Sequence, residues 1–79
     1  MGEMVKFGEI SIGEQFILTD HLGQKSIWIK KSGSIGTGNN AIMFSGRYND
    51  IGFHSNNSGT LVFGARMGIS RKTMVEKRW

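Results

Sequence analysis

The sequence predicts an all-β fold, a small five-stranded barrel of the SH3-like or OB-like kind. Apolar and polar residues alternate over several short stretches, which is the pattern of half-buried strands. The 79 residues include 12 glycines and no proline. Glycine accepts the backbone angles of tight turns and disfavours helix interiors. Gly- and Asn-rich turns separate the alternating stretches, so we expect many short strands in a single domain, residues 1–79.

The predicted elements follow one another with short connections. Residues 5–10 are expected to form either a short strand or a turn of helix, and residues 12–14 a turn. A Gly-containing hairpin loop over residues 20–24 joins the first two clear strands. The turn at 56–59 is rich in Asn and Gly, which both accept the left-handed conformation. The predicted strands are residues 14–19, 25–31, 40–45, 51–55 and 60–65.

Alternation within the strands gives a predicted core. In each strand, one set of apolar side chains is assigned to the interior. Trp28 and Lys30 are then predicted to project from the face opposite Ile27 and Ile29. The expected core residues are Phe7, Ile10, Phe16, Leu18, Ile27, Ile29, Ile42, Phe44, Leu61 and Phe63.

Two segments depart from the strand pattern. Residues 32–40 are rich in Gly, Ser and Asn and are expected to form a flexible surface loop. Residues 66–79 form a basic tail, with five Lys and Arg residues against Glu76. The tail pattern fits a short amphipathic helix or a strand near residues 73–75, and the sequence leaves both open.

The net charge of +4 is unevenly distributed. Residues 1–29 carry a net charge of −2, whereas residues 30–79 carry +6. This asymmetry favours an anionic partner for the C-terminal part, and the alternative is that the charge serves solubility.

No constellation of residues predicts an enzyme, a metal site or a cofactor. Cysteine is absent, and the two histidines, His21 and His54, lie in separate turns or strand ends without other ligands at suitable spacing. The Gly36-Thr37-Gly38 segment lacks the Lys-Ser/Thr ending of a phosphate-binding P-loop. No apolar run approaches the roughly 20 residues that span a bilayer, and the N-terminus does not have the pattern of a signal peptide. We therefore expect a cytoplasmic protein with no membrane partner.

The N-terminal half contains a recognisable series of residues: Phe7, Ile10, Gly13 and Phe16, then Trp28 and Lys30, then Asn40-Ala41. This series resembles small bacterial and bacteriophage proteins of unknown function that open with Phe-x-x-Ile/Leu-x-x-Gly-x-x-Phe. The resemblance covers residues 7–63, and the chain departs from it in its Gly/Asn loop and its basic tail. It implies a phage or mobile-element product with a small β-barrel, in a bacterial host cytoplasm. It implies no catalytic residues.

The sequence therefore predicts binding without catalysis. The first hypothesis is an interaction module that modulates a host or phage protein. The second is nucleic-acid binding, with Trp28 stacking on bases inside a basic groove. A third is a structural or assembly role. For Trp28 the alternative is a second hydrophobic layer beneath the loop or the tail. The oligomeric state is left open. The predicted partner-binding residues are Trp28, Lys30, Lys31, Arg47, Tyr48, Arg66, Arg71, Lys72 and Trp79.

Overall fold

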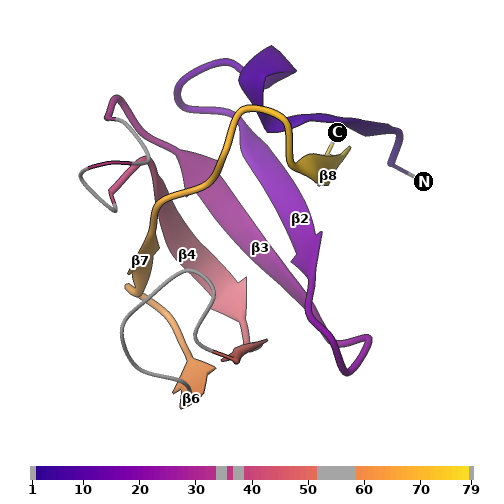
Figure 1. Ribbon diagram of the computed structural model, residues 1–79, viewed down its shortest axis with the longest axis vertical. Coiled ribbons are helices and arrows are strands. Elements are labelled where there is room, and N and C mark those ends of the chain that lie inside the picture. Colours follow the sequence, from indigo (N-terminus) through magenta and orange to yellow (C-terminus); the bar gives the residue numbers. More distant parts are fainter. Residues whose placement is uncertain (1, 34–35, 37–38, 52–58, 79) are drawn as a thin grey trace.

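The fold is all-β, as predicted. The computed structural model describes residues 2–33, 36, 39–51 and 59–78. Six strands form one antiparallel sheet in the order β1-β8-β2-β3-β4-β7, and β5 pairs with β6 in a separate two-stranded sheet (Figure 1). The expected number of five strands is wrong, since the described residues contain eight strands and one short 3-10 turn, η1. The larger sheet is not closed, because its edge strands β1 and β7 are not paired with each other.

The predicted strands agree best with the structure in the centre of the sheet. Predicted strands 14–19, 25–31 and 40–45 correspond to β2, β3 and β4 within one residue at each end. The predicted strand 51–55 lies outside the described residues except for Ile51, and the predicted strand 60–65 is shorter, because a turn follows Leu61. The elements are β1 Met4–Lys6, η1 Phe7–Glu9, β2 Gln15–Thr19, β3 Lys25–Lys30, β4 Ala41–Gly46, β5 Tyr48–Asp50, β6 Gly59–Leu61, β7 Arg66–Met67 and β8 Met74–Lys77.

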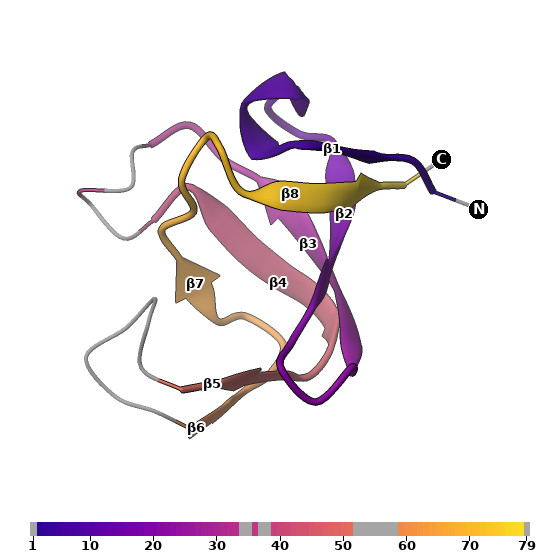
Figure 2. The ribbon, with the colours of Figure 1, turned by 45° about the vertical axis from the view of Figure 1, so that its right-hand side comes forward.

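The structure decides between strand and helix for residues 5–10 and for the C-terminal tail. Residues 5–10 contain the end of a strand followed directly by a 3-10 turn, so each of the two expected structures accounts for part of the segment. The tail at 66–78 contains no helix and instead supplies β7 and β8. Strand β8 lies between β1 and β2, and it crosses the end of the curled sheet opposite the β5–β6 pair (Figure 2). The predicted basic tail is therefore a structural part of the sheet.

The buried residues show that β3 and β4 turn inward the face that was predicted to point outward. Phe7, Ile10, Phe16 and Leu18 are buried as predicted. Leu61 is partly buried and packs against the core, whereas Phe63 is 74% exposed. Ile27, Ile29 and Ile42 are only partly buried and lie on the opposite side of the sheet from the core, and Phe44 is 47% exposed. Their places inside are taken by residues that the sequence analysis had not assigned to the core: Trp28, Ala41, Met43, Met67, Ile69 and Val75.

The burial of Trp28 explains this inversion. Its indole is completely buried, and its Nε1–H donates a hydrogen bond of 2.8 Å to Oγ of Ser26, which is itself buried. The indole also packs edge-on against Tyr48, with ring centroids 6.1 Å apart. Since Ser26 and Trp28 are two residues apart in β3, they lie on the same face. A strand that turns its largest side chain inward must turn Ile27 and Ile29 outward.

The pairing of β3 with β4 extends the same choice of face to the next strand, since Trp28 lies opposite Met43 and Ile29 opposite Ile42. The β3–β4 register shifts between Ile27 and Trp28, and Phe44 is the extra residue in β4. Gly46 ends this strand with a φ of +93°, and a Cβ atom there would lie 2.9 Å from the carbonyl oxygen of Lys25. Only glycine fits this close approach without strain.

Asp20 joins the β2–β3 hairpin to the smaller sheet. Its carboxylate accepts hydrogen bonds from the backbone N–H groups of Leu22 and Gln24, at 2.9 and 2.8 Å. It also accepts bonds from the backbone and side-chain N–H groups of Asn49 in β5, at 2.8 and 2.6 Å. Desolvation opposes ionisation of the carboxyl group, but these hydrogen bonds outweigh it and lower the pKa of Asp20 from 3.8 to about 2.

We predict that Asp20→Asn lowers stability in a pH-dependent way. Because the pKa of Asp20 is depressed in the folded state, its carboxylate stabilises the fold fully above its ordinary pKa of 3.8. This contribution is lost as the pH falls from 3.8 towards 2. Urea unfolding of both proteins between pH 7 and 2 should give a difference in free energy of unfolding that is constant near neutrality and shrinks in acid. A difference independent of pH would contradict this role of the carboxylate.

We also predict that Ser26→Ala destabilises the protein by leaving the buried indole N–H of Trp28 without an acceptor. An unsatisfied buried donor costs about 1–3 kcal/mol. Chemical denaturation measures the loss, and Ser45→Ala in β4 is the matched control, because Ser45 is exposed. The control should change stability by less than about 0.5 kcal/mol. In a Trp28→Phe background, which has no indole N–H, Ser26→Ala should cost clearly less.

Candidate functional site

Lys30 occupies a fixed position at one end of the sheet. Its Nζ donates hydrogen bonds to the carbonyl oxygens of Phe7 and Ile10, at 3.2 and 2.7 Å. The same ammonium lies 4.6 Å from the centroid of the Phe7 ring, which is within cation–π distance. Lys30 therefore holds η1 against the end of β3, and its side chain is half-buried there.

A tight turn over Ser70–Thr73 places two further cations beside Lys30. The turn is closed by a 3.0 Å hydrogen bond from the N–H of Thr73 to the carbonyl of Ser70. It is attached to η1, because the N–H groups of Phe7 and Gly8 donate to the carbonyls of Thr73 and Arg71, at 2.8 and 3.0 Å. Arg71 and Lys72 occupy its two central positions and are exposed. The turn is thus positioned by backbone contacts that leave both basic side chains available.

These elements enclose a cleft of about 520 Å³, which we call the basic cleft. Three of its described lining residues are cationic, and none is acidic. Glu14, which precedes β2, accepts a 2.7 Å hydrogen bond from the N–H of Ser11, which lowers its pKa, and both Lys77 and Lys30 lower it further. The described lining residues are Phe7, Lys30, Gly33, Asn40, Ile69, Ser70, Arg71 and Lys72.

Asn40 supports the inner wall of the basic cleft. Its side-chain amide donates to the carbonyl of Ile69 at 2.8 Å, and its Oδ1 accepts from the N–H of Ile69 at 2.7 Å. Its backbone N–H donates to Met67, and its carbonyl accepts from Lys31. These four hydrogen bonds fix Asn40, and the two formed by its side chain hold Ile69 in the segment that leads to the Ser70–Thr73 turn. The sequence identified Asn40 only as part of a motif.

The second surface of interest is the outward side of β2, β3 and β4. Ile17 lies opposite Ile27, and Ile29 lies opposite Ile42, so the four side chains are adjacent on this side. They do not pack against the buried core, and Phe44 follows at the bulge as an exposed ring. We call these five residues, Ile17, Ile27, Ile29, Ile42 and Phe44, the outer face.

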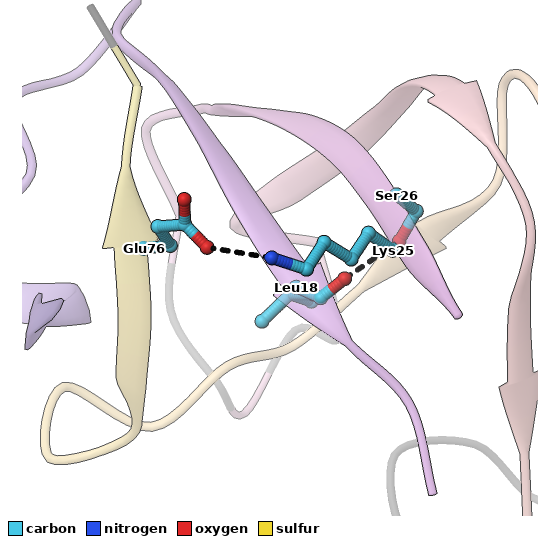
Figure 3. Close-up of polar contacts among 4 residues, drawn as sticks. All are labelled: Leu18, Lys25, Ser26 and Glu76. Atoms are coloured by element: carbon cyan, nitrogen blue, oxygen red, sulfur yellow. Dashed lines mark hydrogen bonds and ion pairs between the residues drawn. The ribbon is translucent and has the colours of Figure 1, made fainter. Parts of the chain in front are cut away.

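Basic residues border the outer face. Lys25 begins β3 two residues before Ile27, Lys31 directly follows the strand two residues after Ile29, and Arg66 is the β7 partner of Ile42. The Nη1 of Arg66 donates to Oδ1 of Asn39 at 3.0 Å. Glu76 of β8, the partner of Ile17, is the acidic neighbour, and it forms a 3.3 Å ion pair with Lys25 (Figure 3). The border thus has three cations against one carboxylate, which gives it a net positive charge.

The predicted site residues fall into several separate groups. Lys30, Arg71 and Lys72 meet in the basic cleft, whereas Lys31 and Arg66 border the outer face. Arg47 is exposed and follows β4 at the other end of the sheet. Trp79 lies outside the described residues. Sequence spacing could not have grouped these cations, because β7 was not predicted and a strand near residues 73–75 was only one of two alternatives for the tail.

Two aromatic residues of the predicted site are not available for binding as expected. Trp28 is completely buried, so its prediction as a stacking platform or interface anchor is wrong, and its indole lies in the main core instead of in a second layer beneath the loop or the tail. Tyr48 is half-buried against Trp28. Desolvation, with the nearby charges of Asp50 and Asp20, raises the pKa of the Tyr48 hydroxyl.

A smaller apolar pocket of about 190 Å³ lies where β2 and β8 separate. These strands pair only at Phe16 with Lys77 and at Ile17 with Glu76. Beyond Ile17, the described lining includes Leu18, Tyr48, Met67, Ile69 and Met74. No sequence pattern predicts this pocket, because it depends on the divergence of two strands that are distant in the chain.

In the part of the chain that the structure describes, no three His, Cys, Asp or Glu side chains come together as metal ligands. His21 forms a 3.0 Å hydrogen bond through Nδ1 with the carbonyl of Asn49, and His54 lies outside the described residues. No helical segment among the described residues has the length and apolarity to cross a membrane.

Comparison with known proteins does not extend these observations to a family. No protein-family model, no curated protein and no solved structure matches the chain.

Proposed function

We propose that this protein is a non-enzymatic interaction module that binds a partner protein through the outer face. The observation that carries the proposal is the adjacent set of outward-facing aliphatic side chains on β2, β3 and β4. An antiparallel sheet commonly packs one face on the core and turns a polar face to water. In this sheet the core covers the inner side, yet the outer face is apolar as well. Contiguous exposed apolar residues with a polar border are typical of protein interaction sites.

The charge of the border indicates the chemistry of the partner. Lys25, Lys31 and Arg66 are cationic, and Glu76 is already paired with Lys25. Two copies of this chain would bring these cations together, and juxtaposed like charges disfavour association. We therefore propose a partner segment with apolar side chains flanked by Asp or Glu residues. This partner class is more specific than the host or phage protein expected from the sequence.

The proposal also keeps the small-barrel interpretation of the fold. We interpret the curled six-stranded sheet as an open barrel of the SH3-like or OB-like kind, with β1 and β7 as its free edges. The strong curvature supports this interpretation, since one continuous sheet surrounds a single core.

We predict that Ile27→Thr/Ile29→Thr strongly weakens partner binding without unfolding the protein. Threonine keeps the β-branched shape favoured in strands but removes apolar contact area. A random peptide library displayed on particles is selected against the immobilised protein, and affinities of the enriched peptides are measured by fluorescence polarisation. We expect enriched peptides with apolar residues flanked by acidic ones, and a loss of at least about tenfold in affinity in the double variant.

Val62→Thr is the matched control, because Val62 is 52% exposed and does not belong to the outer face. It should leave peptide affinity unchanged. Equal binding by the Ile27/Ile29 double variant would overturn the proposal. So would a homodimer, detected by sedimentation, that the double variant dissociates, since a second copy would then occupy the outer face.

A further inference from the structure

We propose that the basic cleft is a binding site for a phosphate group, present as inorganic phosphate or carried on a small phosphate ester. The site lies at the end of the sheet formed by η1 and the Ser70–Thr73 turn, and it is separate from the outer face. This inference does not depend on the proposed function. Three cationic side chains with no carboxylate among the described lining residues give the cleft a strongly positive potential.

Lys30 supplies a cation that is already in place before a ligand arrives. The carbonyl oxygens of Phe7 and Ile10 engage two of the three N–H donors of its ammonium, and they hold it at the base of the cleft. Among the described residues these two carbonyls are the acceptors of the ammonium, which leaves one donor for an anion. Because the side chain is ordered by these contacts, little rotamer entropy is lost on binding.

Arg71 and Lys72 supply mobile charges on a fixed backbone. The Ser70–Thr73 turn is joined to η1 by two backbone hydrogen bonds, so the Cα positions of both residues are set relative to Lys30. An arginine side chain can donate two parallel hydrogen bonds to phosphate oxygens, and a lysine adds a third cationic donor. Phosphate is the anion that best matches this combination, because it carries up to two charges and several acceptor oxygens.

The size of the cleft indicates whether it would bind free phosphate or a phosphate ester. Its volume of about 520 Å³ lies in the range of small-molecule sites, roughly 300–1,000 Å³, and exceeds what one phosphate ion fills. Phe7 and Ile69 give it an apolar part beside the cations. A phosphate ester with a small organic group therefore uses more of the cleft than inorganic phosphate does.

The test measures binding to the intact protein by isothermal titration and by amide chemical shifts. The probes are inorganic phosphate, ribose 5-phosphate and, at equal ionic strength, sodium chloride. Saturable shifts should appear at Gly8 and at residues 70–73. Arg71→Gln and Lys72→Gln should each weaken phosphate binding about five- to tenfold, the loss expected for one partly exposed charged hydrogen bond.

Arg47→Gln is the matched control, since it also removes one positive charge, and Arg47 lies between β4 and β5 and does not line the cleft. It should change affinity by less than about twofold. Tighter binding of ribose 5-phosphate supports an ester as the ligand, and equal binding supports free phosphate. The inference is overturned if neither inorganic phosphate nor ribose 5-phosphate gives saturable shifts in the cleft. It is also overturned if Arg47→Gln weakens binding as much as Arg71→Gln. A single-stranded oligonucleotide that binds in proportion to its length and is not displaced by phosphate would also overturn it, in favour of a nucleic-acid strand.

Discussion

The inward orientation of Trp28 is the constraint on which the rest of the structure depends. The indole fills the centre of the core, and the hydroxyl of Ser26 satisfies its one polar group. Once this side chain is inside, strand geometry forces Ile27 and Ile29 outward, and pairing forces Ile42 outward with them. The same residue thus determines both the composition of the core and the apolar character of the opposite side of the sheet.

The sequence predicted the strands better than it predicted their faces, and the reason is physical. Alternation reveals which face is buried only when one face is polar. In β2 the burial of Phe16 and Leu18 was predicted, but in β3 Ile27 and Ile29 compete with Trp28, and both faces are apolar. The larger side chain occupies the interior. Lys30, two residues after Trp28, follows it to the inner side, where carbonyl oxygens of the N-terminal segment compensate its partial burial.

The grouping of basic residues could not be obtained from spacing along the chain. Lys30 is about forty positions from Arg71 and Lys72 in sequence. The three meet because the connection between β7 and β8 passes over η1, and because the side chain of Asn40 holds Ile69 through two hydrogen bonds. Net charge indicated that cations would matter in the C-terminal part. Only the strand order shows that some of them converge while others, such as Arg66 and Arg47, stand apart.

The pairing of β1 with β8 has a mechanical consequence. These strands are antiparallel, and the two ends of the described chain leave from the same side of the sheet, next to the hydrogen bond between Lys77 and Glu3 (Figure 1). Tension applied between the two ends would therefore load this bond first and then the pairs from Glu76 inward, one after another. A force of this kind peels the outermost strand from the sheet and leaves the core around Trp28 intact during the first steps. The protein would yield gradually at its ends instead of resisting as a single unit.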